Sequence, residues 1–252
     1  RGEILSFIPV EKNVEVMLVT ITNTGRMAQT VTPTAAIPLY GRSADNIRDH
    51  RHVTSLLHRI ETTDTGVLVT PTLSFDERGH QVNHMTYYCV GWSGNGEKPV
   101  DFYPTAEDFV GEGGNFERPY AIVKKAEGVK AGTRIEGLEA VGGLHFSEVT
   151  LEPEEECSYL IFTGITEDIQ EIRNLSKTYT TREMVLEELE KTKAYWQEKV
   201  NVAYHTGDSD FNQFMHWVRA QYRLQYRDFY ANGRGVRGCR AVRWLGKSKY
   251  RQ

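Results

Sequence analysis

The sequence is poor in cysteine and contains no long hydrophobic run. Its three cysteines, Cys89, Cys157 and Cys239, are far apart and form no CxxC pair, which argues against a disulfide framework or a cysteine zinc site. No apolar segment approaches the roughly 20 residues that a membrane-spanning helix needs. The first residues also lack the charged and then apolar pattern of a signal peptide. We therefore expect a cytoplasmic protein with no membrane partner.

An excess of basic residues is also missing. The chain has 30 Lys and Arg against 34 Asp and Glu, for a net charge of −4, whereas nucleic-acid-binding proteins usually carry a broad positive excess. We expect no nucleic-acid partner. The GxSxG, P-loop and HExxH motifs are absent, and no GxGxxG follows a predicted strand, so no motif identifies a catalytic residue or a cofactor.

Alternating, β-branched segments fill the first 165 residues. Such short segments, bounded by Gly, Asn and Asp, predict an antiparallel sandwich or barrel. VEVMLVTITN (14–23) is expected to form a hairpin with AQTVTPTAAIPLYG (28–41), and HVTSLLHRIET (52–62) to form a further strand. The same pattern continues in GVLVTPTLSFDE, HMTYYCVGWSG and HFSEVTLEPEEECSYLIFTGIT. Residues 104–142 are rich in glycine and charge and predict long loops, with a short helix at TAEDFVG.

From about residue 167 the hydrophobic period becomes helical. Thr180 and Glu183 fit a capping box, and the helix after them has an apolar face with helical spacing. Asp208 or Ser209 is expected to cap a second amphipathic helix. The apolar face of the first helix comprises Val185, Leu189, Thr192, Trp196 and Val200, and that of the second comprises Phe211, Phe214, Met215, Val218 and Tyr222.

The stretch YGRSADNIRDHRHVTSLLHR (40–59) gathers four arginines, three histidines and two aspartates. His50 and His52, with the histidines of DERGHQVNH (76–84), could bind zinc or copper. Arg48 and Arg51 interleave with the first pair, and a cation site gains nothing from guanidinium groups, so hydrogen-bonded histidines in a polar loop are the favoured interpretation and no metal is expected.

Other chemistry remains open from the residues alone. The carboxylate pairs Asp45/Asp49, Asp76/Glu77 and Asp108/Glu112 are available for glycosidic chemistry, and the sequence does not choose among them. Arginine alternating with Asn, Asp and His suits sugar hydroxyls and phosphate. Aromatic residues could stack on a ligand or fill the core: Tyr87, Tyr88, Trp92, Phe102, Tyr103, Phe116 and Tyr120.

Four separated segments carry a family resemblance: VTPTAAIPLYGRSADNIRDHRHVTSLLHR, LSFDERGHQVNH, FYPTAEDFVGEGG and KAYWQEKVNVAYHTGDSDFNQFMHWV. They resemble the inverting β-glycoside phosphorylases of glycoside hydrolase family 94, once called glycosyltransferase family 36. Within it, the chain is most similar to 1,2-β-oligoglucan phosphorylases and cyclic β-1,2-glucan synthetases.

The resemblance implies a mainly β fold: a large antiparallel β-sandwich followed by a helical linker and the first helix of an (α/α)6 barrel. We accordingly expect a sandwich at 1–165, a linker at 166–204 and the barrel helix at 205–232. It also implies a reaction of a β-linked gluco-oligosaccharide with inorganic phosphate, a co-substrate, to give glucose 1-phosphate. No separate cofactor and a homodimer are expected.

In such enzymes the catalytic acid lies in the barrel, so we assign no catalytic residue here and expect the chain alone to be inactive. Residues 233–252 are basic, and from Phe229 onward the chain has seven Lys or Arg and no acid. Arg237 matches a sugar-holding arginine, but Gly238 follows where an acid is expected. We therefore expect the tail to be frame-changed or non-native.

The resemblance also directs attention to two loops, 40–52 and 111–120. In family members such loops can border the sugar site of a partner subunit. The expected carbohydrate-facing or interface residues are Arg42, Asp45, Arg48, Asp49, His50, Arg51, Asn115, Phe116 and Arg237. Two other interpretations stay open: a free-standing carbohydrate-binding or oligomerisation module, and a metal-dependent sandwich enzyme.

Overall fold

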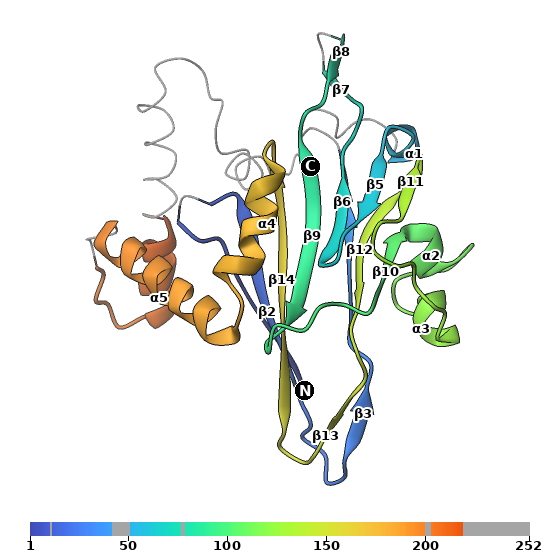
Figure 1. The fold of residues 1–252 in the computed structure, drawn as a ribbon. Helices are drawn as coiled ribbons and strands as arrows, with labels where there is room; N and C mark the ends of the chain where they lie inside the picture. Colours follow the sequence, from blue (N-terminus) through green and yellow to red (C-terminus); the bar gives the residue numbers. More distant parts are fainter. Residues whose placement is uncertain (11, 42–50, 77–78, 200–202, 219–252) are drawn as a thin grey trace.

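A computed structural model describes residues 1–10, 12–41, 51–76, 79–199 and 203–218 (Figure 1). Its strands are β1 (Gly2–Phe7), β2 (Val14–Thr22), β3 (Gln29–Val31), β4 (Thr34–Leu39), β5 (Arg59–Thr62), β6 (Gly66–Val69), β7 (Leu73–Asp76), β8 (Gly79–Val82), β9 (Thr86–Ser93), β10 (Asp101–Thr105), β11 (Arg134–Glu136), β12 (Ala140–His145), β13 (Val149–Leu151) and β14 (Glu156–Thr166). Its helices are α1 (Arg51–Ser55), α2 (Ala106–Val110), α3 (Tyr120–Lys124), α4 (Ile169–Thr178) and α5 (Arg182–Lys199), and residues 209–218 are also helical.

The centre of the fold is a seven-stranded antiparallel sheet with the order β1-β2-β14-β9-β6-β5-β11. A three-stranded sheet, β10-β12-β4, packs on one face of it, and α4 and α5 cover part of the other face (Figure 1). The small sheets β13-β3 and β7-β8 extend from the two ends. The prediction of a mainly β, antiparallel sandwich followed by helices is confirmed.

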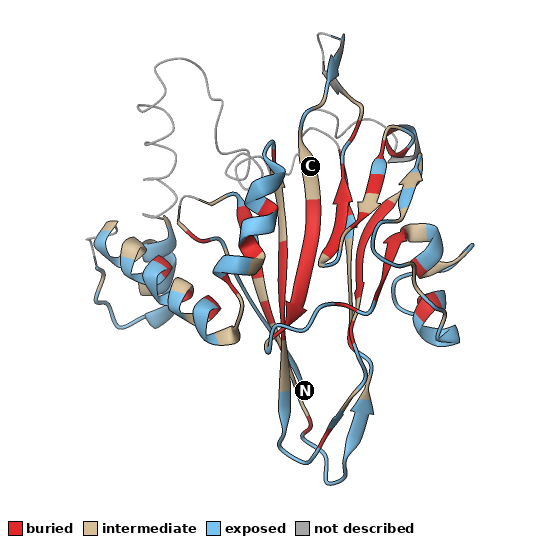
Figure 2. Cartoon of the chain, in the orientation of Figure 1, coloured by how far each residue is buried: buried red, intermediate tan, exposed pale blue. Residues whose placement is uncertain are grey.

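Both faces of the large sheet are buried because its central strands alternate between two cores. On β9, Tyr88, Val90 and Trp92 belong to the core under the helices, whereas Cys89 belongs to the core between the sheets. β2 and β14 divide their side chains in the same way, as the strand period of two requires. The buried residues accordingly concentrate in the central strands (Figure 2).

The two sheets approach closely at Gly142 on β12. A Cβ atom there would lie 2.2 Å from Cβ and 2.7 Å from Sγ of Cys89, so a larger residue requires the sheets to separate. Burial raises the pKa of the Cys89 thiol to about 12. Cys89 is therefore a core residue rather than a reactive one.

Several sequence-based strand assignments were wrong. β2 pairs with β1 and β14, not with residues 28–41, whose strands β3 and β4 pair with β13 and β12. Part of the expected strand 52–62 is helix α1, so that only Arg59–Thr62 pairs as β5. The expected strand 66–77 is interrupted around Pro71, which lacks a backbone donor. Residues 104–142 contain α2, α3, β11 and the start of β12 rather than long loops alone.

The local helix predictions were more accurate. Thr105 caps α2, and its Oγ1 accepts a hydrogen bond from the Asp108 N–H at 3.0 Å. Asp208 caps the helix at 209–218 by accepting from the N–H groups of Asp210 and Phe211 at 2.9 and 3.0 Å. The capping box expected at Thr180 does not form as predicted, since α5 begins at Arg182.

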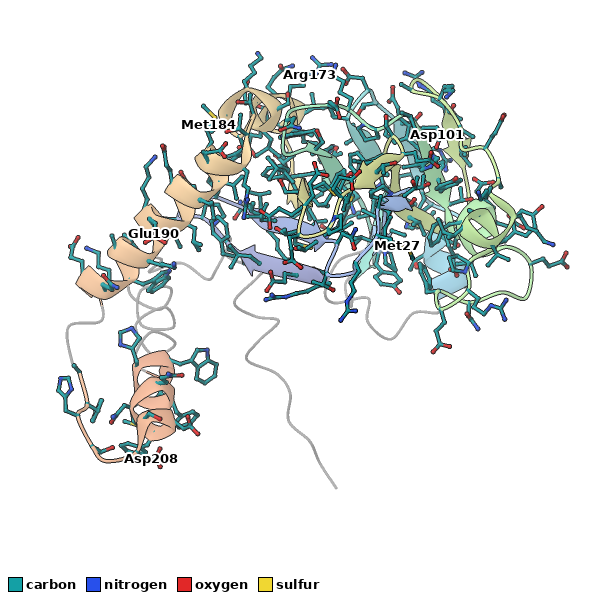
Figure 3. The ribbon with its side chains drawn as sticks, turned by 90° about the horizontal axis from the view of Figure 1, so that it is seen from below. Met27, Asp101, Arg173, Met184, Glu190 and Asp208 are labelled. Atoms are coloured by element: carbon teal, nitrogen blue, oxygen red, sulfur yellow. The ribbon has the colours of Figure 1, made fainter. Side chains whose placement is uncertain are left out.

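The apolar face predicted for α5 is confirmed in its first turns, where Val185, Leu189 and Thr192 are buried. Figure 3 shows α5 running outward from the sheets, with Met184 nearest to them and Glu190 farther away. The predicted domain boundaries at 165, 204 and 232 stay predictions.

Candidate functional site

The face that carries α2 has two hollows, one on each side of this short helix. β10 leads directly into α2, and Phe109 of α2 is buried beside Tyr103, with ring centroids 5.7 Å apart. The Phe116 ring lies 5.9 Å from that of Phe109. Phe116 thus connects the largely exposed 111–120 segment to α2, and Ala106 and Glu107 at the start of α2 line different hollows.

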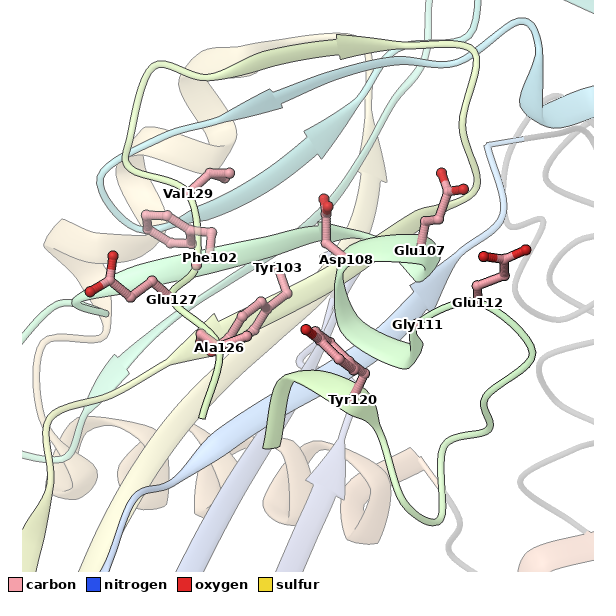
Figure 4. Close-up of a pocket in the computed structure, with 11 residues that line it drawn as sticks. Phe102, Tyr103, Glu107, Asp108, Gly111, Glu112, Tyr120, Ala126, Glu127 and Val129 are labelled. Atoms are coloured by element: carbon pink, nitrogen blue, oxygen red, sulfur yellow. Dashed lines mark hydrogen bonds between the residues drawn. The ribbon is translucent and has the colours of Figure 1, made fainter. Parts of the chain in front are cut away.

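The first hollow is a groove of about 360 Å³ between α2, α3 and the segment 126–129 (Figure 4). Its lining residues are Phe102, Tyr103, Glu107, Asp108, Gly111, Glu112, Tyr120, Ala126, Glu127, Gly128 and Val129. Tyr120 is 52% exposed, and the hydroxyl of Tyr103 donates to the Ala126 carbonyl at 2.7 Å. The described lining thus holds four carboxylates and no lysine or arginine.

These carboxylates do not converge. Asp108 accepts a hydrogen bond from the Thr105 hydroxyl at 2.7 Å, while Glu107, Glu112 and Glu127 project in different directions in Figure 4. Among the residues that the structure describes, no group of three or more His, Cys, Asp or Glu is placed to hold a metal ion. The groove is therefore an acidic surface rather than a converged cation site.

The second hollow is a small pocket of about 30 Å³ on the other side of α2. Its lining residues are Pro38, Leu39, Tyr40, Thr54, Ser55, His58, Ala106, Phe116, Glu139, Ala140 and Val141. Tyr40 and Phe116 are each 48% exposed, whereas His58 is 4% exposed. Two aromatic residues at the surface thus accompany a polar interior, in a space that admits one water molecule or one hydroxyl group.

His58 is the most unusual residue of this pocket. Its Nδ1 lies 3.1 Å from the Leu138 carbonyl oxygen, and its buried Nε2 lies beside Gly41, whose backbone also favours the protonated ring. Burial lowers the pKa of His58, although the carbonyl groups of Leu138 and Gly41 and the carboxylate of Glu139 favour the charged ring. The imidazole is therefore neutral near pH 7.

Most of the predicted site residues lie outside the described residues: Arg42, Asp45, Arg48, Asp49, His50 and Arg237. Arg51 is the first residue of α1, and the placement of its side chain is also outside the description. Phe116 lines the small pocket. Asn115 shapes its own loop, because its Oδ1 accepts from the N–H groups of Glu117 and Arg118, both at 3.0 Å.

The structure joins the two predicted loops at one place. Tyr40, at the start of the first loop, and Phe116, in the second, line the same pocket. Sequence analysis did not select Tyr40, His58 or Glu139 as site residues, because nothing local distinguishes them from ordinary strand and loop residues. Of the three carboxylate pairs considered, Asp108 and Glu112 line the acidic groove.

Most aromatic residues that were considered for ligand stacking belong to the core instead. Trp92, Phe102 and Tyr103 are each at most 3% exposed. Trp92 stacks on Phe162 with ring centroids 4.8 Å apart. No helix within the described residues is long and apolar enough to cross a membrane.

Comparison with known families identifies the fold. Residues 1–182 match the family model described as Glycosyl hydrolase 94, supersandwich domain. No curated protein matches the chain significantly. The match spans β1 to the first residue of α5 and covers more than half of the chain, so this chain belongs to glycoside hydrolase family 94 through its supersandwich domain.

Proposed function

We propose that this chain is the supersandwich part of an inverting β-glucoside phosphorylase. The reaction joins a β-linked gluco-oligosaccharide and inorganic phosphate and gives α-glucose 1-phosphate and a shortened sugar. The observation that carries the proposal is the family match over residues 1–182. The four resembling segments further favour β-1,2-linked glucose oligomers as substrates, in a cytoplasmic enzyme.

The chemistry requires little from this part of the enzyme. A phosphate oxygen forms the new bond to the anomeric carbon from the face opposite the leaving group, so the configuration inverts from β to α. The glycosidic bond breaks, and one carboxylic acid gives its proton to the departing oxygen. In this proposal that acid belongs to a helical barrel, and the chain of 252 residues is inactive by itself.

One feature supports a role as one part of a larger enzyme. The helix at 209–218 has large aromatic residues about half exposed: Phe211 at 44%, Phe214 at 57% and Trp217 at 56%. Such a face is suited to packing against further helices.

The test is an assay of phosphate release from glucose 1-phosphate with a panel of β-linked gluco-oligosaccharide acceptors. It compares this chain with a form extended through the coding sequence downstream. We expect turnover in the extended form alone. Turnover by the chain of 252 residues, or none in a folded extended form with any acceptor, would overturn the proposal.

A free-standing sugar-binding or assembly module is the alternative. It predicts that neither neighbouring reading frame downstream encodes a helical barrel. In that case the chain still folds and self-associates or binds sugar, but no extended form supports phosphorolysis.

A further inference from the structure

The large sheet has an outer strand, β1, whose free edge is open along its whole length. Within the described residues β1 pairs only with β2, and its first five residues are exposed. Arg1 and Thr22 exchange both of their backbone hydrogen bonds, each at 2.8 Å. Because bonded and non-bonded positions alternate along an antiparallel pair, the N–H and C=O groups of Gly2, Ile4 and Ser6 point away from β2.

The other outer strands of the large and the three-stranded sheets carry protection that β1 lacks. β11 has three residues, of which Arg134 and Glu136 form ion pairs with β5. β10 is bridged by Val129, and β4 contains Pro38, which has no backbone donor. β1 has six residues in unbroken register without proline or lysine, and its Ile4 is 69% exposed. An unprotected edge of this kind is a template for a further strand.

The backbone of this edge is complementary to itself. When two β1 strands run antiparallel about a two-fold axis at Ile4, Ile4 of one copy opposes Ile4 of the other, and Gly2 opposes Ser6. All outward backbone groups of both strands are then paired, in about six hydrogen bonds. Because directly opposed residues share one face of a sheet, the two exposed Ile4 side chains cover each other.

The charges of β1 are compatible with this register. Arg1 and Glu3 form an ion pair within the strand, so each copy brings a neutralised pair to the edge. In the register centred on Ile4, Glu3 faces Leu5 of the other copy. Arg1 faces Phe7, so no two like charges stand directly opposite. Leu5 is 37% exposed, and the second strand covers more of its apolar surface.

We propose that β1 is a dimerisation strand whose partner is β1 of a second copy of this chain. The two seven-stranded sheets then continue into each other across the axis. A strand of six residues on each side buries less than the roughly 1,000 Å² that stable interfaces reach, so we expect a weak dimer that dissociates on dilution. This interface is independent of the proposed reaction, because it depends only on the backbone and the exposure of β1.

Sedimentation velocity of the chain of 252 residues, from micromolar to near-millimolar concentrations, tests for the dimer. Ile4→Lys sets two ammonium groups directly opposite at the axis, and we expect it to raise the dissociation constant at least about tenfold. Ile122→Lys is the matched control, because Ile122 is 45% exposed on α3 and undergoes the same change of side chain and charge. It should leave the dimer unchanged, and circular dichroism checks that both variants are folded.

Cysteine cross-linking tests the register. The background carries Cys157→Ser and Cys239→Ser and keeps Cys89, which is buried. Ile4→Cys places two cysteines opposite each other with their Cα atoms about 5.5 Å apart, a separation that a disulfide spans, so oxidation should give a covalent dimer. Ser6→Cys is the control, because the two cysteines then lie about four residues apart along the strands, roughly 13 Å, and should stay unlinked.

Three results would overturn the interface. A chain that sediments as a monomer at every concentration forms no such dimer. A dimer that survives Ile4→Lys is held together elsewhere, and its loss in Trp217→Lys, at a residue that is 56% exposed, would place it on the helix at 209–218. A Ser6→Cys protein that cross-links as readily as the Ile4→Cys protein would contradict the two-fold axis at Ile4.

Discussion

Tyr179 connects the C-terminal helices to the large sheet, and its replacement tests how strongly they are joined. The residue is 2% exposed, and its ring stacks on Phe162 with centroids 5.6 Å apart. Its carbonyl accepts from Nε1 of Trp92 at 2.7 Å. Its hydroxyl is hydrogen-bonded to Nζ of Lys12, which also pairs with Glu188 at 3.5 Å.

Two substitutions separate the contributions of the ring and of the hydroxyl. Tyr179→Phe removes one hydrogen bond, and we expect the free energy of unfolding to fall by about 1 kcal/mol. Tyr179→Ala also removes a buried ring, and large-to-small aromatic replacements in a core cost about 3–5 kcal/mol. Lys12→Met should cost about 0.5 kcal/mol, because the Lys12 side chain is 37% exposed and water screens its interactions.

The assay is urea unfolding followed by tryptophan fluorescence and circular dichroism. Tyr120→Ala is the matched control, because Tyr120 is 52% exposed and its loss should change stability by less than about 0.5 kcal/mol. If Tyr179→Ala unfolds within about 1 kcal/mol of the unmodified protein, or if Tyr179→Phe costs as much as Tyr179→Ala, the reasoning is wrong.

Three more predictions concern the core and the small pocket. Gly142→Ala should lower the free energy of unfolding by about 1–3 kcal/mol, because the new Cβ would lie 2.2 Å from that of Cys89. Denaturation should show that Cys89→Gly restores part of this stability and that Cys89→Ala does not. Gly2→Ala is the neutral control. The second prediction uses a Cys239→Ser background, in which mass spectrometry should find Cys157 labelled by a thiol reagent at about pH 8. Cys89, whose pKa burial raises to about 12, should be labelled only after unfolding. Burial lowers the pKa of His58 from 6.5, so below about pH 6.5 the unfolded chain binds more protons than the folded one, and the contribution of His58 to stability falls as the pH drops. Thermal unfolding of His58→Asn should lack this part of the pH dependence. A pH profile identical to that of the unmodified protein would contradict the lowered pKa of His58.

Local patterns anticipated the helices better than the strand partners. The cap at Asp208 and the buried face of Val185, Leu189 and Thr192 depend on residues three or four positions apart, which the sequence contains in full. One of the two partners of β2 is β14, at the far end of the sheet-forming part of the chain. An alternating pattern identifies a strand without saying which other strand pairs with it.

The candidate site shows the same division. The sequence selected the loops 40–52 and 111–120 and the aromatic Phe116. It did not select His58, because a histidine at the start of a short strand has no distinctive local pattern. Its buried environment arises only when Leu138, far along the chain, comes to lie 3.1 Å from Nδ1 and the packing closes over Nε2 beside Gly41.

By itself, the sequence determined the β-rich fold class, the terminal helices and the family resemblance, since these depend on composition, periodicity and local segments. The tertiary structure alone decided which strands pair, that both faces of the large sheet are buried, and that Tyr40, Phe116 and His58 line one pocket. The physical reason is that burial and hydrogen-bond satisfaction are properties of contacts between distant segments, and a chain specifies those contacts only through its whole packed arrangement.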